Sequence, residues 1–157
     1  MKINIGISEK HLKNTSSMLG VILSDEMTLY IKTRKAHWNV TGESFMELHK
    51  LFENQYKQLE ESIDEVAERI GKLGHKTIGT MNEFLKLSSV KENPGDYASS
   101  KDTLKELLND HETIIVELRK NITDCVETNK DAGTADFLTG LMKQHETTAW
   151  ILRRYLN

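Results

Sequence analysis

The hydrophobic positions of this chain recur with the spacing of an α-helix rather than the alternation of a β-strand. The clearest run is residues 43–73, where apolar side chains return every three or four positions and form a single stripe. The stripe consists of Phe45, Leu48, Phe52, Leu59, Ile63, Val66, Ile70 and Leu73. A similar spacing predicts an earlier helix from Ser8, a plausible N-cap, to His37. Residues 39–42 end in a glycine and are expected to form the turn between the two helices.

The second half of the chain repeats the pattern after a longer connection. A short helix is expected over Met81–Leu87, and the run 93–96, Asn-Pro-Gly-Asp, indicates a turn. A third long helix is predicted from Ser99 or Ser100 to Thr128, and a fourth from about 131–134 to Leu156. The connection is too long for a tight hairpin and is typical of a crossover between parallel neighbours in a bundle. The expected fold is all-α: a four-helix bundle with a short extra helix in the crossover, in one domain spanning residues 1–157.

The helix predicted over 43–73 also carries two pairs of metal-type ligands. His49 with Glu53 and Asp64 with Glu68 are each spaced i, i+4, so each pair projects from one face. At about 100° per residue, the four side chains share an arc of roughly 100°. That arc is centred about 120° from the apolar stripe, so it is not the face buried in the monomer's own core.

The axial distance between the pairs sets a further condition. Glu53 and Asp64 are separated by about 16 Å along a helix, whereas metal–ligand bonds are about 2 Å long. One chain therefore cannot bring both pairs to a single metal. Either the pairs are unrelated surface charges, or two copies of the helix lie antiparallel across a two-fold axis and share the site, which then occurs twice in the dimer.

The residues around these pairs resemble the signature of the Dps family, the ferritin-like mini-cages named as DNA-binding proteins from starved cells. The resemblance is carried by Lys35-Ala36-His37-Trp38-Asn39-Val40-Thr41-Gly42, then His49, Glu53 and the run 64–70, Asp-Glu-Val-Ala-Glu-Arg-Ile. The run 134–141 and the segment from Trp150 to Arg153 resemble the family's last helix. Likeness extends over nearly the whole chain and implies a ferritin-like four-helix bundle.

The resemblance also implies a ligand set for iron at a site between subunits. The family's two histidines fall on His37 and His49, and the acid that follows the second falls on Glu53, where many members have Asp. The acid pair of the partner subunit falls on Asp64 and Glu68. Glutamate keeps the charge but adds a methylene, so direct or water-mediated binding by Glu53 stays open.

The function implied by the resemblance is iron storage and detoxification. A ferroxidase would oxidise Fe(II), with hydrogen peroxide as the preferred oxidant, and store ferric iron in a hollow homododecamer that protects against oxidative stress. His37, Asp64 and Glu68 would hold the tighter iron position, and His49 with Glu53 a weaker one. One or two imidazoles with several carboxylates suit Fe(II) among redox-active metals.

Three further residues have two readings each. Trp38, beside the first histidine, could tune the site or absorb oxidising equivalents, but packing at an interface explains it equally well. Asp131 and Asp136 match a region that lines the family's iron-entry pore, although acids are favoured near any helix N-terminus. The histidines at 11, 75, 111 and 145 lack a matched ligand set and are expected to be surface, capping or core residues. No histidine has Glu three positions before it, which argues against the di-iron site found inside other ferritin-like bundles.

Charge and composition separate the main reading from its rival, a non-enzymatic protein that binds and compacts DNA. The formal net charge is −3, so there is no basic excess to neutralise phosphates, and DNA binding is expected to be weak or absent. The single cysteine, Cys125, suits a reducing compartment and a role as a small buried hydrophobe. Neither a membrane span nor a signal peptide is apparent, so a cytoplasmic location is expected.

Overall fold

The first two long helices begin and end where the sequence places their signals. In the computed structural model, which describes residues 3–157, helix α1 spans Glu9–Asn39 and helix α2 spans Phe45–Lys72. The Ser8 hydroxyl caps α1 by accepting a hydrogen bond from the His11 amide at 3.3 Å. Gly42, with φ of 103°, occupies the left-handed region in the loop between α1 and α2. This backbone angle is favourable for glycine and strained for other residues, which explains the break in the pattern.

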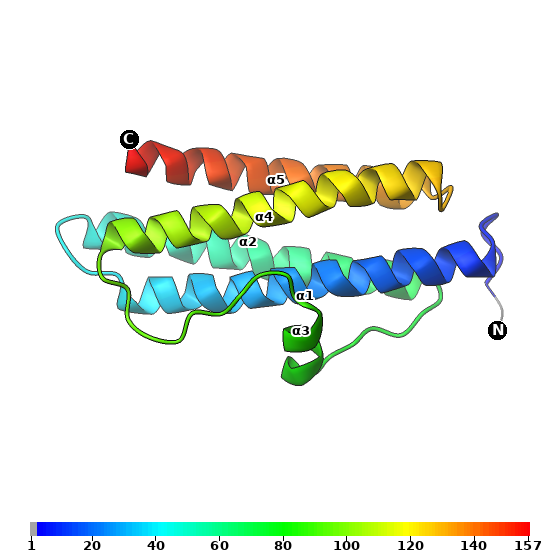
Figure 1. Ribbon diagram of the computed structural model, residues 1–157, viewed down its shortest axis with the longest axis horizontal. Coiled ribbons are helices and arrows are strands. Elements are labelled where there is room, and N and C mark those ends of the chain that lie inside the picture. The colour runs from blue at the N-terminus through cyan, green and yellow to red at the C-terminus, as the bar shows by residue number, and fades with distance from the viewer. Residues whose placement is uncertain (1–2) are drawn as a thin grey trace.

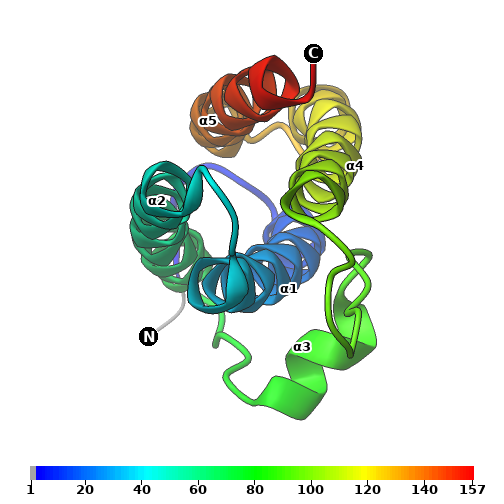
Figure 2. The ribbon, with the colours of Figure 1, turned by 90° about the vertical axis from the view of Figure 1, so that its left-hand side faces the viewer.

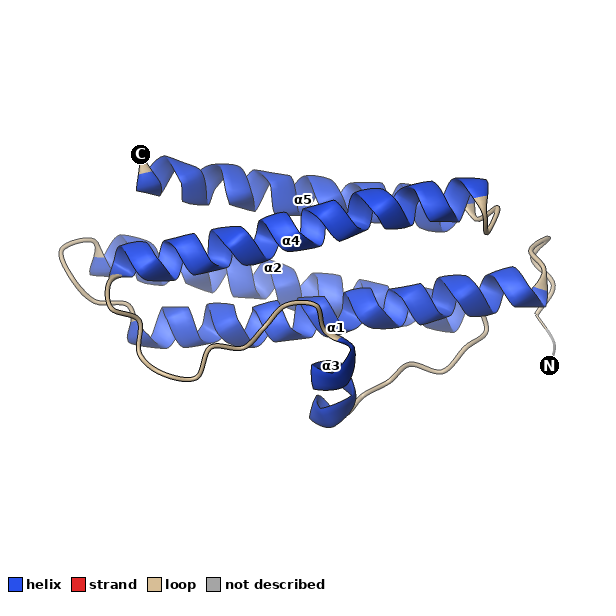
Figure 3. Cartoon of the chain, viewed as in Figure 1, coloured by secondary structure: helices blue, strands red, loops and turns tan. Residues whose placement is uncertain are grey.

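The remaining elements confirm the predicted order. Helix α3 spans Met81–Leu87, α4 spans Ser100–Glu127 and α5 spans Ala132–Leu156. Thr80 and Glu83 form a reciprocal capping box at the start of α3, and Ser99 caps α4 by accepting from the Asp102 amide at 3.2 Å. Every element is a helix and the described residues contain no strand, so the all-α prediction is confirmed (Figure 3).

The four long helices form two antiparallel hairpins that pack side by side. Helix α1 packs on α2 and α4 packs on α5, while the hairpins meet chiefly along α1 and α4 (Figures 1 and 2). The crossover carries α3, which packs against α1. Helices α2 and α4 run in the same direction, as expected, but Figure 2 places them at opposite corners of the bundle instead of side by side. The crossover therefore connects helices at diagonally opposite corners. Helices α2 and α4 each pack against the antiparallel partner of their own hairpin, and the hairpins meet along α1 and α4.

The core is built from the apolar stripes that the helices turn inward. Of the stripe predicted on α2, six members are buried, whereas Ile63 is half-buried and Phe45 is exposed. Phe45 lies in the first turn of α2, where its ring packs beside His49 with ring centres 5.1 Å apart. Cys125 is fully buried, and its burial raises the pKa of the thiol to about 11. It is therefore the small core residue that was predicted, with little nucleophilic thiolate.

Buried polar groups tie the crossover to α1. The Asp25 carboxylate accepts hydrogen bonds from the Ser88 hydroxyl and from the Ser89 amide, at 3.0 and 2.6 Å. Lys32 pairs with Asp110 of α4 at 2.6 Å and donates to the Lys91 carbonyl at 2.7 Å. Because buried charges are tolerated only when they are paired, these bonds hold the crossover in one path along α1.

Candidate metal site

His37 and His49 come together where α1 ends and α2 begins. The loop between the two helices folds back and stacks their rings, with ring centres 3.7 Å apart. The Nδ1 atom of His37 lies 2.8 Å from the His49 carbonyl oxygen, and Nδ1 of His49 lies 2.9 Å from the His37 carbonyl oxygen. A carbonyl oxygen only accepts, so each Nδ1 carries its proton and donates. In the neutral form, a ring that donates from Nδ1 keeps its lone pair on Nε2, which is the arrangement of a metal-binding histidine held by a backbone partner.

Aromatic and cationic side chains surround this histidine pair. Tyr56 approaches His37 edge-on, with ring centres 5.2 Å apart. The Arg34 guanidinium lies over the Tyr56 ring at 4.5 Å and over the Trp38 ring at 5.3 Å. Trp38 packs against Arg34 but is 62% exposed. Much of its ring could therefore contact another chain. Both readings of Trp38 stay predictions.

Glu53 lies one turn after His49 and is engaged by two lysines. Its carboxylate accepts from Lys50 at 2.8 Å and pairs closely with Lys57. These hydrogen bonds hold the pKa of Glu53 down, at about 2. The group is therefore anionic at any physiological pH, but its charge is already compensated. A metal ion would have to displace the ammonium groups or accept them as neighbours.

Asp64 and Glu68 lie further along α2, away from the histidines. Both are exposed, and Glu68 pairs with Lys72 at 3.1 Å. Asp64 borders a groove of about 530 Å³ whose floor includes Met27, Tyr30 and Ala67. Within residues 3–157 of one chain, no group of three or more His, Cys, Asp or Glu side chains is arranged to hold a metal ion. The chain thus brings His37, His49 and Glu53 to one region of the α1–α2 hairpin and leaves Asp64 and Glu68 about 16 Å or more along the helix.

Asp131 and Asp136, the expected pore residues, lie in different environments. Asp131 is buried as the N-cap of α5, where its oxygens accept from the Thr134 amide at 2.9 Å and hydroxyl at 2.6 Å. The Arg69 guanidinium also donates to Asp131 at 3.2 Å. It lies against Gly133, where a Cβ atom would come within 3.0 Å of the Arg69 Nη2 atom. Asp136 is exposed. The contacts of Asp131 agree with the alternative explanation, an acid favoured at the start of a helix, and the pore role of both residues stays a prediction.

Replacing the buried aspartate is expected to destabilise the chain much more than replacing the exposed one. Asp131→Ala removes a helix cap, worth about 1 kcal/mol, and leaves Arg69 without its carboxylate partner, although its bond to the Thr134 hydroxyl remains. We expect a loss of about 2–3 kcal/mol in the free energy of unfolding, measured by urea denaturation. Asp136→Ala is the matched control and should change it by no more than about 0.5 kcal/mol. Equal effects would show that Asp131 does not anchor α5.

Sequence reasoning did not assign a role to Arg69 or to a polar cluster in the core. Arg69 has no metal-binding capacity, but it links α2 to the start of α5. His111 and His145, which were expected to be surface, capping or core residues, are core residues with exposures of 2% each, and His145 bonds to buried Glu26. No spacing rule identifies that cluster, because Glu26 and His145 are 119 positions apart.

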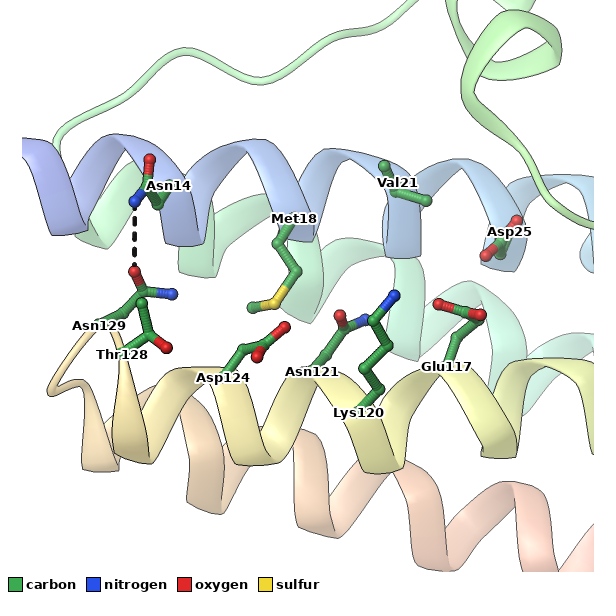
Figure 4. Close-up of a pocket in the computed structure, with 10 residues that line it drawn as sticks. All are labelled: Asn14, Met18, Val21, Asp25, Glu117, Lys120, Asn121, Asp124, Thr128 and Asn129. Atoms are coloured by element: carbon green, nitrogen blue, oxygen red, sulfur yellow. Dashed lines mark hydrogen bonds between the residues drawn. The ribbon is translucent and has the colours of Figure 1, made fainter.

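A hollow of about 440 Å³ lies elsewhere, between α1 and α4 (Figure 4). Its lining mixes amides, carboxylates and Lys120, and Asn14 donates to Asn129 across it at 3.5 Å. None of the predicted iron ligands reaches it.

Comparison with known proteins places this chain in a family. The model of the ferritin-like domain matches residues 17–157. A low temperature-induced protein of Nostoc sp. is 42% identical over 99% of this chain and 87% of its own length. The DNA protection during starvation protein 2 of Bacillus anthracis is 35% identical over 92% of this chain and 98% of its own length.

Solved structures agree with the sequence relatives. The Dps protein of Vibrio cholerae O1, described as a member of a superfamily of ferritin-like diiron-carboxylate proteins, superposes with a TM-score of 0.93. It is 27% identical, and the match covers 100% of this chain and 98% of that one. The chain is therefore a member of the ferritin-like family and, within it, of the Dps proteins. Over the described residues, none of the helices has the length and apolar character that crossing a bilayer requires.

Proposed function

We propose that this protein is a ferroxidase and iron store, which oxidises Fe(II) at sites shared between two subunits and keeps ferric iron in a dodecameric cage. The observation that carries the proposal is the His37–His49 pair, whose Nδ1 atoms both bond to backbone carbonyls. This leaves two Nε2 lone pairs available at one place. Membership of a ferritin-like, diiron-carboxylate group supports iron as the metal.

The missing ligands would come from a second copy of the α1–α2 hairpin. Two α2 helices running antiparallel across a two-fold axis would set His37, His49 and Glu53 of one chain opposite the Asp64 and Glu68 positions of the other. Such an isologous contact makes the site twice. The exposed position of the acid pair and the groove beside Asp64 support this arrangement, because both lie on the face that the monomer leaves open.

The proposed ligands differ in how readily they would accept iron. Asp64 and Glu68 are exposed carboxyl side chains, and with His37 they would bind the tighter iron. Glu53 is held by Lys50 and Lys57, so the position completed by His49 and Glu53 would be the weaker one. Carboxylates favour Fe(III) over Fe(II) and so promote oxidation. With hydrogen peroxide as oxidant, two Fe(II) ions each give one electron, the O–O bond breaks, and two protons complete two waters.

Anaerobic titration with Fe(II), followed by hydrogen peroxide, tests the function. We expect saturable binding of Fe(II) and consumption of one peroxide for every two irons oxidised. The protein mass should be that of twelve chains in sedimentation. Oxidation no faster than that of free Fe(II) would overturn the proposal.

The alternative function is DNA binding without catalysis, and it is raised by the names of the relatives. The proteins from Bacillus anthracis and Helicobacter pylori are both called DNA protection during starvation proteins. The net charge of −3 per chain opposes contact with phosphates, so we expect metal-free protein to leave plasmid unshifted on a gel at low salt. A tight, salt-sensitive shift would favour the alternative.

We place the activity in the cytoplasm, in line with the free, buried thiol of Cys125.

A further inference from the structure

Three buried polar side chains form a chain across the interior of the bundle. His145 of α5 lies between Glu26 of α1 and His111 of α4. Its Nε2 atom is 2.7 Å from Glu26 Oε1, and its Nδ1 atom is 2.8 Å from His111 Nδ1. The exposed fraction is 0% for Glu26 and 2% for each histidine. Three of the four long helices are thus joined by groups that are costly to bury unless they bond to one another.

The two histidines face each other as hydrogen-bond partners and not as ligands of one metal. Their ring centres are 5.0 Å apart while the Nδ1 atoms are 2.8 Å apart, so the nitrogens lie almost on the line between the rings. Two metal ligands would instead direct their lone pairs at a common point beside that line. The described part of the chain likewise has no cluster of three ligands arranged for a metal.

A bond between two imidazole nitrogens has room for one proton. One nitrogen donates it and the other must keep its lone pair. While the bond lasts, at most one of His111 and His145 is a cation. Burial and the neighbouring His145, which bonds to Glu26, both oppose a proton on His111, so His111 is the histidine that must stay neutral.

The other nitrogen of His111 faces a small cavity. Its Nε2 atom bonds to no residue within 3–157, and the same holds for both polar atoms of the Gln55 side chain. A cavity of about 10 Å³, room for about one water, lies between α2, α4 and α5 and is lined by these two residues. When His145 donates to Nδ1, neutral His111 carries its own proton on this Nε2, so a second proton can bind only at Nδ1 and must displace the bond to His145.

We propose that the Glu26–His145–His111 network is an acid-sensitive latch of the bundle. It holds α1, α4 and α5 together while His111 is neutral, and it breaks when a second proton binds His111. The latch is separate from the iron site and does not depend on the proposed ferroxidase activity.

The surroundings of His111 give the direction of the effect. Apart from His145, the side chains that line the cavity are uncharged: Gln55, Gln58, Leu59, Ser62, Gln144 and Thr148. The two charged neighbours in sequence, Asp110 and Glu112, are paired with Lys32 and Arg153 respectively. Burial, together with charge on His145, holds the pKa of His111 well below its ordinary value. Stability from this neutral histidine is therefore present above the unfolded value of about 6.5 and is lost as pH falls below it.

The test compares urea unfolding of the full protein from about pH 7.5 to about pH 5 with that of His111→Asn. The side-chain amide of asparagine reaches about the position of Nδ1 and can accept from His145 through its oxygen or donate through its NH2, but it cannot become a cation. In wild type, the proton that His111 takes up on unfolding should raise the unfolding equilibrium constant by up to roughly tenfold for each pH unit of acidification. In His111→Asn this contribution should be absent, so stability should fall less steeply with pH. His11→Asn, a half-buried histidine near the start of α1, is the control and should keep the slope of wild type.

Equal acid slopes for wild type and His111→Asn would overturn the latch. Neutron diffraction of wild-type crystals provides a second measurement in case the variant does not fold. It should show one deuteron between the two Nδ1 atoms at mildly acid pH. Both histidines doubly protonated in the intact bundle would refute the proposal.

Discussion

Two variant chains that are each inactive are expected to regain iron oxidation when they assemble together. His37→Ala/His49→Ala removes the imidazoles, and Asp64→Ala/Glu68→Ala removes the acid pair. In a dimer of one chain of each kind, one shared site is intact and the other lacks both halves. Random pairing of equal amounts makes half of the dimers mixed, so roughly a quarter of the wild-type rate should return. The measurement is Fe(II) oxidation by peroxide after co-refolding or co-expression.

The control for this experiment is a mixture of the two variants assembled separately and then combined without exchange of chains. That mixture should stay inactive, and sedimentation should show cages of the same size in both samples. Well-formed mixed cages that remain inactive would contradict a site shared between chains. Activity in either variant alone would move the chemistry to other residues.

Much of the fold could be predicted from the sequence because the helices of this chain bury one face each. The period of the apolar residues gave the long helices, and capping residues such as Ser8 and Ser99 gave their first turns. Phe45 was the exception, since the first turn of α2 lies beside His49 and outside the core. The diagonal placement of α2 and α4 was not predictable from loop length, which limits the distance between helix ends but not the corner that each helix occupies.

The candidate site was predictable in its residues and not in its hydrogen bonds. Spacing on one helix groups His49 with Glu53, but the stacking of His37 on His49 depends on how the intervening loop folds back. Lys50 and Lys57, at i−3 and i+4 from Glu53, could have been recognised as its partners from spacing alone. The ion pair between Asp131 and Arg69 requires contact between α2 and the start of α5, which no local pattern reports.

Removing the Glu68 carboxylate is expected to weaken iron binding far more than removing that of Glu53. Glu68→Gln keeps the shape of the side chain and removes the carboxylate of a proposed ligand, whose only partner within residues 3–157 is the exposed Lys72. We expect Fe(II) affinity to fall by at least about tenfold to hundredfold. That is the usual loss when a residue that only hydrogen-bonds to a metal ligand is removed, and losing a ligand itself should cost no less. Glu53→Gln should cost less, because Lys50 and Lys57 already compensate that charge. Anaerobic calorimetry with Fe(II) and the initial rate of oxidation by peroxide measure both effects.

The matched control for these variants is Glu65→Gln, which removes an exposed carboxylate from the same helix, just outside the arc that carries the proposed ligands. Because it changes the net charge of the chain by the same amount, it isolates ligand loss from the general attraction of cations. Its Fe(II) affinity should stay close to that of wild type. If Glu68→Gln behaves like Glu65→Gln, the acid pair on α2 is a solvated charge pattern and binds no iron. If Glu53→Gln shows the larger loss, the two lysines must release Glu53 when iron binds, and the weaker and tighter iron positions are reversed.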